Sequence, residues 1–170
     1  MKKIQLLNIA LALFILTAVS CKKAEETPVS GEPAKEAFDL AATKPAIEER
    51  YRAFENAFNA KDSTALANCY TTDAKFMNPN DKSAEGRPAI QKTFGMWFKG
   101  DTSKTKIKLN LVELWGDENT LTAEDAWTMT DKDGKLIDEG KSLEVYKMED
   151  GKWLLYRDCY NSNMPAMPMK

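Results

Sequence analysis

A change of hydrophobic period begins at Ile107-Lys108-Leu109-Asn110-Leu111-Val112-Glu113-Leu114-Trp115. Its first five residues alternate apolar and polar side chains, which is the period of a half-buried β-strand. Val112 then interrupts the alternation, and Leu114 resumes it one position out of phase. One extra residue in a strand predicts a β-bulge, and a bulge bends its strand as a curved sheet requires.

Before this stretch the apolar residues recur at helical spacing. A first helix is predicted after Pro45, which suits a first-turn position, and it extends to about Ala60. Asp62 is the expected cap of a second, shorter helix, and a third is expected to begin near Gly86 and Pro88. A short strand is predicted over residues 74–78. The inward-facing residues are Ile47, Tyr51, Phe54 and Phe58 in the first helix, Leu66, Cys69 and Tyr70 in the second, and Ile90, Phe94, Trp97 and Phe98 in the third.

After Trp115 the period of two continues through three further predicted strands. Asp133-Gly134 and Asp150-Gly151 mark the tight hairpin turns between them. Helices followed by an antiparallel meander predict an α+β fold, with the helices packed on one face of the sheet. The apolar positions that define these strands are Leu121, Ala123, Trp127 and Met129, then Leu143 and Val145, then Trp153, Leu155 and Cys159.

The first forty-four residues have a different character from the rest of the chain. A short basic start and an apolar run to Val19 are typical of a secretory signal peptide. The run closes with Ala18-Val19-Ser20-Cys21, which predicts a lipoprotein signal over residues 1–20 and lipidation of Cys21. Residues 21–44 hold prolines, glycine and charged side chains, so we expect a flexible tether. These features predict an envelope protein anchored in a membrane by lipid, at the periplasmic face of the outer membrane or at the cell surface.

Composition excludes several classes of function. The formal net charge is −2 at pH 7 and no basic stripe is present, so nucleic acid is not an expected partner. The chain contains no histidine, which excludes Ser-His-Asp and Cys-His catalysis and metal sites built on imidazole. No metal or other cofactor is predicted. Cys69 and Cys159 both lie among apolar neighbours, so two buried thiols are expected, with a disulfide as the alternative.

Several short segments together resemble the nuclear transport factor 2-like superfamily, in particular its SnoaL-like branch, which is related to ketosteroid isomerase. They are Ala57-Phe58-Asn59-Ala60-Lys61-Asp62, Tyr70, Asp73-Ala74, Gly86, Ile90, Gly151-Lys152-Trp153, Arg157-Asp158 and Asn161-Ser162. The resemblance implies a cone-shaped, strongly curved antiparallel sheet wrapped around a long N-terminal helix, with two further helices. It also implies an apolar pocket and, often, a homodimer. We expect this domain to span residues 45–165, followed by a disordered tail at residues 166–170.

Two catalytic positions of the ketosteroid isomerases differ in this chain. Those enzymes use an aspartate before a proline as the base and a tyrosine on the first helix as an oxyanion donor. The matching positions are Asn78, before Pro79, and Phe54. An amide cannot accept that proton and a phenyl ring cannot donate a hydrogen bond, so this chemistry is not expected.

Other polar residues are candidates for a site. Asp125 shares strand parity with Leu121, Ala123, Trp127 and Met129, which aims its carboxylate into the pocket unless a bulge turns it to solvent. Asp158 is a second candidate, although a structural role near the backbone or Arg157 is favoured for it. A carboxylate in an apolar pocket would have a raised pKa and could act as a base near neutral pH. The expected pocket residues are Tyr70, Met77, Asn78, Trp97, Trp127, Asp125 and Asp158, with Tyr160 as a further polar candidate.

Three functions remain open from the sequence. The first is capture of a small apolar molecule without catalysis. The second is a small-molecule isomerase, cyclase or hydrolase that uses Asp158 or Asp125 as a base, with Tyr160 or Asn161 as polar partner. The third is a dimeric interaction module whose cone is filled by core side chains.

Overall fold

The computed structural model describes residues 38–165 of the chain. The predicted signal peptide, Cys21, most of the predicted tether and the predicted tail at residues 166–170 lie outside the described residues. Within residues 38–165, none of the helices has the length and apolar character needed to cross a membrane.

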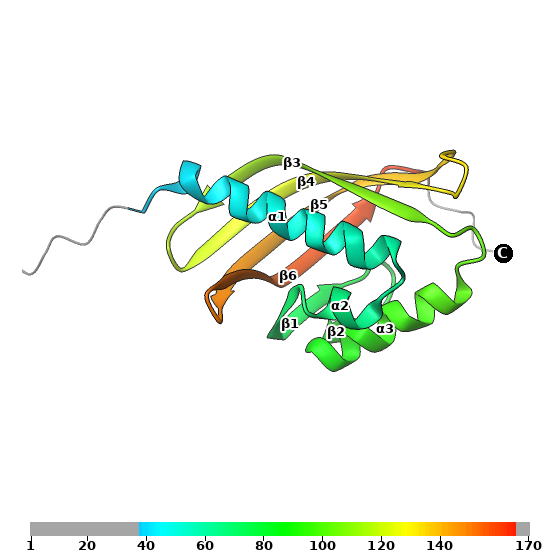
Figure 1. The fold of residues 1–170 in the computed structure, drawn as a ribbon, viewed down its shortest axis with the longest axis horizontal. Helices are drawn as coiled ribbons and strands as arrows, with labels where there is room; N and C mark the ends of the chain where they lie inside the picture. The colour runs from blue at the N-terminus through cyan, green and yellow to red at the C-terminus, as the bar shows by residue number, and fades with distance from the viewer. Residues whose placement is uncertain (1–37, 166–170) are drawn as a thin grey trace, which may run out of the picture. The chain divides into compact units, whose positions relative to one another are not determined.

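One six-stranded sheet forms the framework of the domain, in the strand order β2-β1-β6-β5-β4-β3. Figure 1 shows the sheet with helices on one of its faces, as an α+β fold requires. The strands are β1 (Tyr70–Met77), β2 (Ala84–Glu85), β3 (Lys106–Gly116), β4 (Thr120–Thr130), β5 (Leu136–Glu149) and β6 (Lys152–Ser162). Compared with expectation, β1 begins earlier, at Tyr70, and β2 is an additional strand.

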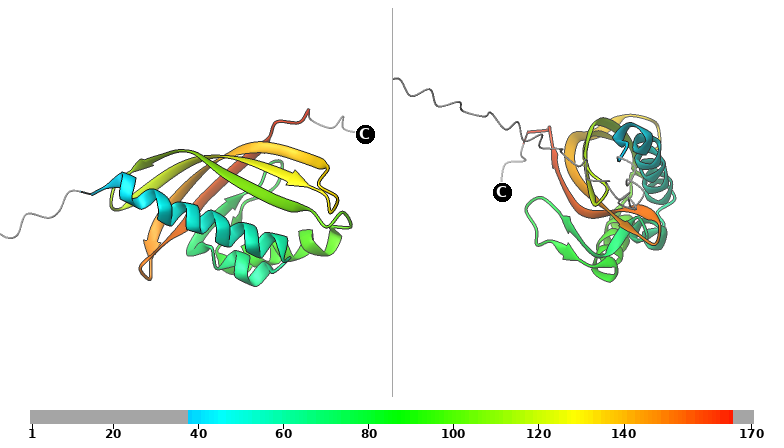
Figure 2. Two further views of the ribbon diagram at one scale, coloured as in Figure 1. Left: turned by 45° about the horizontal axis from the view of Figure 1, so that its top comes forward. Right: turned by 90° about the vertical axis from the view of Figure 1, so that its left-hand side faces the viewer.

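The sheet curves because its long strands carry bulges. The register of β3 against β4 shifts between Leu111 and Glu113, where the sequence predicted a bulge. A second shift lies between Val145 and Tyr146 in the pairing of β5 with β6. Figure 2 shows the resulting bend, which leaves the sheet open and concave toward the helices.

The sheet is mixed, whereas the sequence predicted an antiparallel one. β3 to β6 form the expected antiparallel meander, but β1 pairs with β6 in parallel. Hydrophobic periodicity reports which face of a strand is buried and says nothing about the direction of a neighbour that is distant in sequence. The parallel pair was therefore beyond what the pattern could predict.

The first helix, α1 (Leu40–Asn59), begins before the predicted start, so Pro45 lies inside it and not in its first turn. Asp39 is its N-cap and accepts a hydrogen bond from the Ala42 amide. The preference of proline for a first turn led to the later predicted start, whereas the N-cap Asp39 marks the actual one.

Side chains of α1 complete the exposed edge of β3. The Asn59 carboxamide accepts from the Ile107 amide at 2.8 Å and donates to the Ile107 carbonyl at 3.2 Å. The Glu55 carboxylate accepts from the Leu109 amide at 2.7 Å. Edge strands present unpaired backbone groups, and these two residues satisfy them. The helix is thereby fixed along one side of the concave face.

Two shorter helices lie on the other side of the concave face. Asp62 caps α2 (Ser63–Ala67) as predicted, because its side chain accepts from the Thr64 and Ala65 amides. Tyr70 is not part of this helix, since it begins β1. The helix α3 (Arg87–Gly100) buries Ile90 and Phe94 and packs Trp97 and Phe98 against the core, as predicted.

The facing of β5 and the environment of Cys159 differ from expectation. On β5 the buried side chains are Ser142, Glu144 and Tyr146, while Leu143 is exposed. Cys159 pairs with Leu143 across the strands and is exposed with it, so only Cys69 is a buried thiol among the described residues. Both cysteines are free thiols, without a disulfide. Glycines at positive φ, Gly134 and Gly151, form the two predicted hairpin turns.

Candidate functional site

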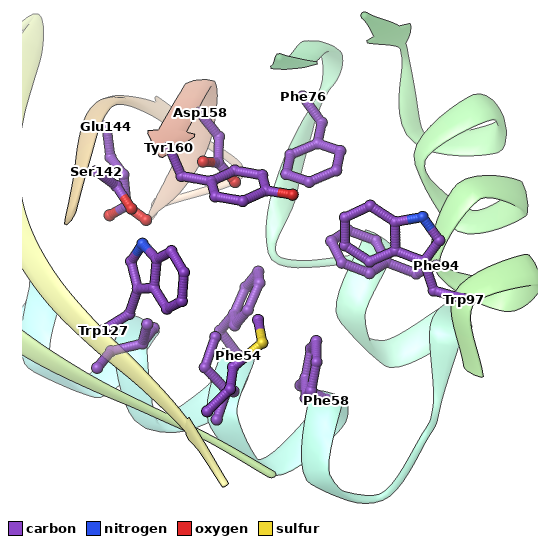
Figure 3. Close-up of a pocket in the computed structure, with 13 residues that line it drawn as sticks. Phe54, Phe58, Phe76, Phe94, Trp97, Trp127, Ser142, Glu144, Asp158 and Tyr160 are labelled. Atoms are coloured by element: carbon purple, nitrogen blue, oxygen red, sulfur yellow. The ribbon is translucent and has the colours of Figure 1, made fainter. Parts of the chain in front are cut away.

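A narrow pocket lies between α1, α3 and the concave face of the sheet. The space inside it that the centre of a water molecule can reach is about 40 Å³. Figure 3 shows aromatic rings around this space, with the oxygens of Ser142, Glu144 and Asp158 at one end. The lining residues are Phe54, Phe58, Phe76, Phe94, Trp97, Ile107, Leu109, Trp127, Met129, Ser142, Glu144, Asp158 and Tyr160.

A wider outer hollow adjoins this inner pocket. Its volume on the same measure is about 390 Å³, and polar residues such as Lys61, Asp101 and Asp138 form part of its wall. Five residues line both spaces: Phe58, Trp97, Trp127, Met129 and Tyr160. The two spaces are therefore neighbours that share a wall of large side chains.

Asp158 lies in the wall of the inner pocket, and its hydrogen-bond partner is Tyr70 instead of the expected backbone or Arg157. The residue is buried and its carboxylate accepts a hydrogen bond from the Tyr70 hydroxyl at 2.5 Å. Arg157 points elsewhere and stacks its guanidinium on the Tyr156 ring. Burial raises the pKa of Asp158 to about 7, although the hydrogen bond from Tyr70 opposes this rise.

Glu144 is a second acid in the pocket, and the sequence analysis missed it. It is buried on β5 and accepts from the Tyr146 hydroxyl at 2.7 Å. Burial, together with the charges of Asp125 and Asp158, raises its pKa well above the usual value. The expected apolar face of β5 was defined by Leu143 and Val145, which placed Glu144 outward. Tyr146, two residues from Glu144, was the sequence feature that could have indicated that Glu144 lies on the buried face.

Asp125 is completely buried, so the alternative that a bulge turns it to solvent is wrong. The bulge lies on β3, and the pairing of Asp125 with Ser142 is regular. Neither carboxylate oxygen has a hydrogen-bond partner of normal geometry among the described residues. Burial raises the pKa of Asp125 to about 6, while the nearby Ser142 hydroxyl lowers it. Asp125 adjoins the pocket from β4 but does not line it.

Three carboxyl groups thus converge at one end of the pocket without a basic partner. Of the described residues that line the inner pocket, none is lysine or arginine. Several negative charges cannot share a buried, uncompensated site, so protonated acids are favoured there. Protonated carboxyl groups can donate hydrogen bonds as well as accept them.

Tyr160 and Asn78 form a polar pair beside the aromatic wall. The Tyr160 hydroxyl donates to the Asn78 side-chain oxygen at 2.6 Å. Its ring stacks on Phe76 with 5.7 Å between centroids and meets Trp127 edge-on at 5.8 Å. Burial raises the pKa of Tyr160 to about 12, so the phenol is neutral at physiological pH.

The other predicted pocket residues divide into two groups. Trp97 and Trp127 line both the inner pocket and the outer hollow. Tyr70 is fully buried behind the wall and reaches the site only through Asp158, whereas Met77 and Asn78 do not line either space. Phe54, at the position of the isomerase tyrosine, does line the inner pocket.

Over residues 38–165, no group of three or more cysteine, aspartate or glutamate side chains has an arrangement that could hold a metal ion. The site is built from rings, phenols and carboxyl groups.

A family model for the SnoaL-like domain matches residues 51–156, which include α3, most of the sheet and most of the pocket wall. The chain belongs to the SnoaL-like domain family. In agreement with the sequence resemblance, solved structures of similar fold include one described as an NTF2-like protein and one described as ketosteroid isomerase-like. No functionally curated protein matches the chain.

Three solved structures illustrate the likeness. An NTF2-like protein with a cystatin-like fold from Novosphingobium aromaticivorans is 15% identical, with a TM-score of 0.67 over 75% of this chain and 86% of that one. A protein of unknown function from Mycobacterium tuberculosis is 18% identical, with a TM-score of 0.64 over 72% and 73%. A ketosteroid isomerase-like protein from Erwinia carotovora atroseptica is 21% identical, with a TM-score of 0.60 over 72% and 98%. These likenesses establish the fold of the SnoaL-like domain.

Proposed function

We propose that this SnoaL-like domain captures a small, mostly apolar molecule in its inner pocket and outer hollow, without catalysing a reaction. The observation that carries the proposal is the placement of the Asp158 and Glu144 carboxyl groups in the wall of an aromatic pocket. Buried acids without cationic partners destabilise a fold, and an apolar core would avoid them. Ligand pockets, in contrast, combine apolar walls with a few polar groups in this way.

The volumes indicate how a ligand would be divided between the two spaces. The inner pocket, at about 40 Å³, admits a small polar group or part of one ring. The outer hollow, at about 390 Å³, is large enough for the remainder of a small organic molecule. A cone filled by core side chains would not place two carboxyl groups in an aromatic wall, so ligand capture is the better supported of the two.

The residues at the isomerase positions support binding without that enzyme's chemistry. Phe54 contributes a ring to the wall, and the Asn78 amide is engaged by Tyr160. Neither group can act as the proton-transferring base or the oxyanion donor at its position.

Native mass spectrometry of the protein purified from its own cells tests the proposal. We expect a retained small molecule in the wild type and its loss in Met129→Trp, which places a larger side chain in the wall that the two spaces share. The matched control is Met148→Trp, at a residue of β5 that is 49% exposed and lines neither space. Equal retention by both variants, or no retained molecule and no uptake of small aromatic probes, would contradict the proposal.

One observation favours a catalytic alternative. Asp158 faces the pocket with a pKa of about 7, which suits a general base near neutral pH. Such a base would remove a proton from a carbon beside a carbonyl group and return a solvent-derived proton to the same ligand. Incubating the retained ligand with protein in D₂O would then introduce deuterium, and Asp158→Asn would abolish the exchange. Absence of exchange in the wild type would contradict catalysis and support ligand binding without a reaction.

We also propose that the protein is an envelope lipoprotein, held at a membrane through Cys21 and the segment that follows it.

We further propose that the domain forms a homodimer. Light scattering of the soluble domain, residues 38–165, tests the dimer, and a monomer mass at micromolar concentration would contradict it.

A further inference from the structure

The indole N–H of Trp127 is a buried donor without a partner. Trp127 is 3% exposed, and its Nε1 has no hydrogen-bond partner among the described residues. Buried tryptophan N–H groups usually find an acceptor, because leaving one unpaired destabilises the folded state. The ring lines both the inner pocket and the outer hollow, so an acceptor can come from a ligand.

The position of this ring is specified by its neighbours on the sheet. Trp127 pairs with Gly140 across β4 and β5. A Cβ at Gly140 would lie 2.2 Å from Cζ2 and 2.6 Å from Cε2 of the indole. The glycine therefore allows the indole to lie directly against the β5 backbone, while Tyr160 meets it edge-on. The orientation of the N–H is thus a built feature of the wall.

The groups around the N–H restrict the charge of its acceptor. Figure 3 shows the Trp127 nitrogen turned toward the end of the pocket where the oxygens of Ser142 and Glu144 lie, with Asp158 close by. An anionic ligand would bring a buried charge into a lining that holds no lysine or arginine to compensate it. A cation would meet the electropositive edge of the indole. An uncharged oxygen avoids both conflicts.

We propose that Trp127 Nε1 donates a hydrogen bond to an uncharged carbonyl or hydroxyl oxygen of the ligand, which makes Trp127 the residue that selects for such an oxygen. The ligand enters through the outer hollow, places its oxygen beside Ser142 and Glu144, and keeps its apolar part among the rings. The inference rests on the proposed binding function and adds the chemical class of the ligand.

The experiment uses the indole N–H signals of the protein itself. The chain has four tryptophans, so ¹H–¹⁵N spectra contain four indole signals, and the one absent from Trp127→Phe belongs to Trp127. The probes are acetophenone, isopropylbenzene, benzoate and benzylamine. We expect acetophenone to shift the Trp127 indole proton downfield and isopropylbenzene to bind without doing so. Benzoate and benzylamine should bind at least about tenfold more weakly than acetophenone, because each would bury a charge that the lining does not compensate.

Affinities of the variants complete the test. Trp127→Phe should weaken acetophenone about fivefold to tenfold, as loss of one hydrogen bond predicts, and change isopropylbenzene less than about twofold. The matched control is Trp97→Phe, because Trp97 lines the same two spaces and its Nε1 is not among the unpartnered buried atoms. That variant should weaken both probes equally.

The outcomes separate the inference from the function beneath it. Binding of acetophenone without a shift at Trp127, or equal affinity for acetophenone and benzoate, would overturn the role of Trp127 and leave ligand capture intact. Failure of all four probes to bind, with no retained molecule, would overturn the proposed function itself.

Discussion

Gly140 shows how one residue without a side chain sets the shape of the pocket. The Trp127 ring occupies the space that a Cβ would need, and the Asn161 carbonyl oxygen would lie 2.1 Å from that atom as well. The glycine is not required for an unusual backbone conformation, because its φ is not positive. Its role is steric.

Gly140→Ala should therefore displace the Trp127 ring and destabilise the fold. Overpacking of this kind typically lowers the free energy of unfolding by about 1 to 3 kcal/mol, which urea denaturation measures. Gly100→Ala is the matched control, since a Cβ there meets nothing within 4 Å and the residue lies in α3. The control should be neutral or slightly stabilising. Equal stability of the two variants would show that the ring can move freely.

The buried acids make stability depend on pH in an unusual direction. Burial raises the pKa of Asp158 to about 7, so the folded state holds this proton more tightly than the unfolded state does. The contribution of protonated Asp158 to the free energy of unfolding is fully present below the pKa of the unfolded state, about 4. It is lost as the pH rises to about 7. Between about pH 5 and pH 8, the wild type should lose more unfolding free energy than Asp158→Asn, whose amide does not titrate.

Urea denaturation across this pH range checks the difference, with Asp131→Asn as a control of opposite sign. Backbone N–H groups of Lys135 and Asp133 lower the pKa of Asp131, so its contribution is present near neutral pH and is lost in acid. The effect of Asp131→Asn should accordingly shrink below about pH 4. Parallel pH curves for wild type and Asp158→Asn would contradict a protonated acid in the pocket.

The acidic residues of the site differed in how well the sequence predicted the direction of their side chains. Asp125 could be placed inward because four apolar residues on β4 share its parity. The face of β6 on which Asp158 lies was ambiguous, because Trp153, Leu154 and Leu155 are consecutive and all buried. No alternation of apolar and polar residues near them indicates which face is inward. Glu144 was placed on the wrong face because its neighbours on both sides are apolar, although Leu143 is exposed. A buried polar residue is specified by its partners, here the Tyr146 phenol two residues away and Tyr51 of α1, which only the fold brings close.

At the scale of elements, the contact between α1 and β3 closes one side of the concave face. Asn59 makes two hydrogen bonds to the backbone of Ile107, a buried residue near the start of β3. Replacement of this carboxamide leaves the Ile107 amide and carbonyl without partners, and such groups are costly when buried.

Asn59→Ala should lower the free energy of unfolding by about 2 kcal/mol, the sum expected for two such bonds. Amide hydrogen exchange at Ile107 should accelerate in the same variant, which locates the effect at the β3 edge. The matched control is Asn56→Ala, an exposed residue of the same helix, which should change stability by less than about 0.5 kcal/mol. Unchanged exchange at Ile107 would show that α1 does not complete this edge.

Helices and strands could be predicted because apolar residues recur with a helical period before Ile107 and with a period of two after it. The caps and turns with strong local chemistry, Asp62 and the two Asp-Gly pairs, lie where the sequence placed them. The bulge on β3 was also readable, because one extra residue changes the phase. The start of α1, the length of β1 and its parallel pairing were not, since they depend on contacts between residues far apart in the chain.

At the scale of the molecule, the pocket results from the curvature of the sheet together with helices on both sides of its concave face. α1 packs beside β3 and α3 beside β1, and their aromatic residues Phe54, Phe58 and Phe94 meet over the centre of the sheet. The polar groups come mainly from β5 and β6, in the middle of the sheet order. The helices thus supply part of the aromatic wall, whereas the acidic end comes from the sheet alone.

The predicted lipid anchor would determine where this pocket works. Cys21 follows the apolar segment directly and lies outside the described residues. Burial of an acyl chain in the membrane contributes about 0.8 kcal/mol of binding free energy per CH₂. Several chains on one cysteine would therefore hold the protein at a membrane permanently. Cys21→Ala should abolish incorporation of radiolabelled palmitate and move the protein from the detergent phase to the aqueous phase. Cys159→Ala is the matched control, because Cys159 is an exposed thiol of the folded domain and should not affect labelling. If Cys21→Ala is labelled as strongly as wild type, Cys21 is not the lipidated residue, and the proposed anchor would be wrong while the pocket chemistry would stand.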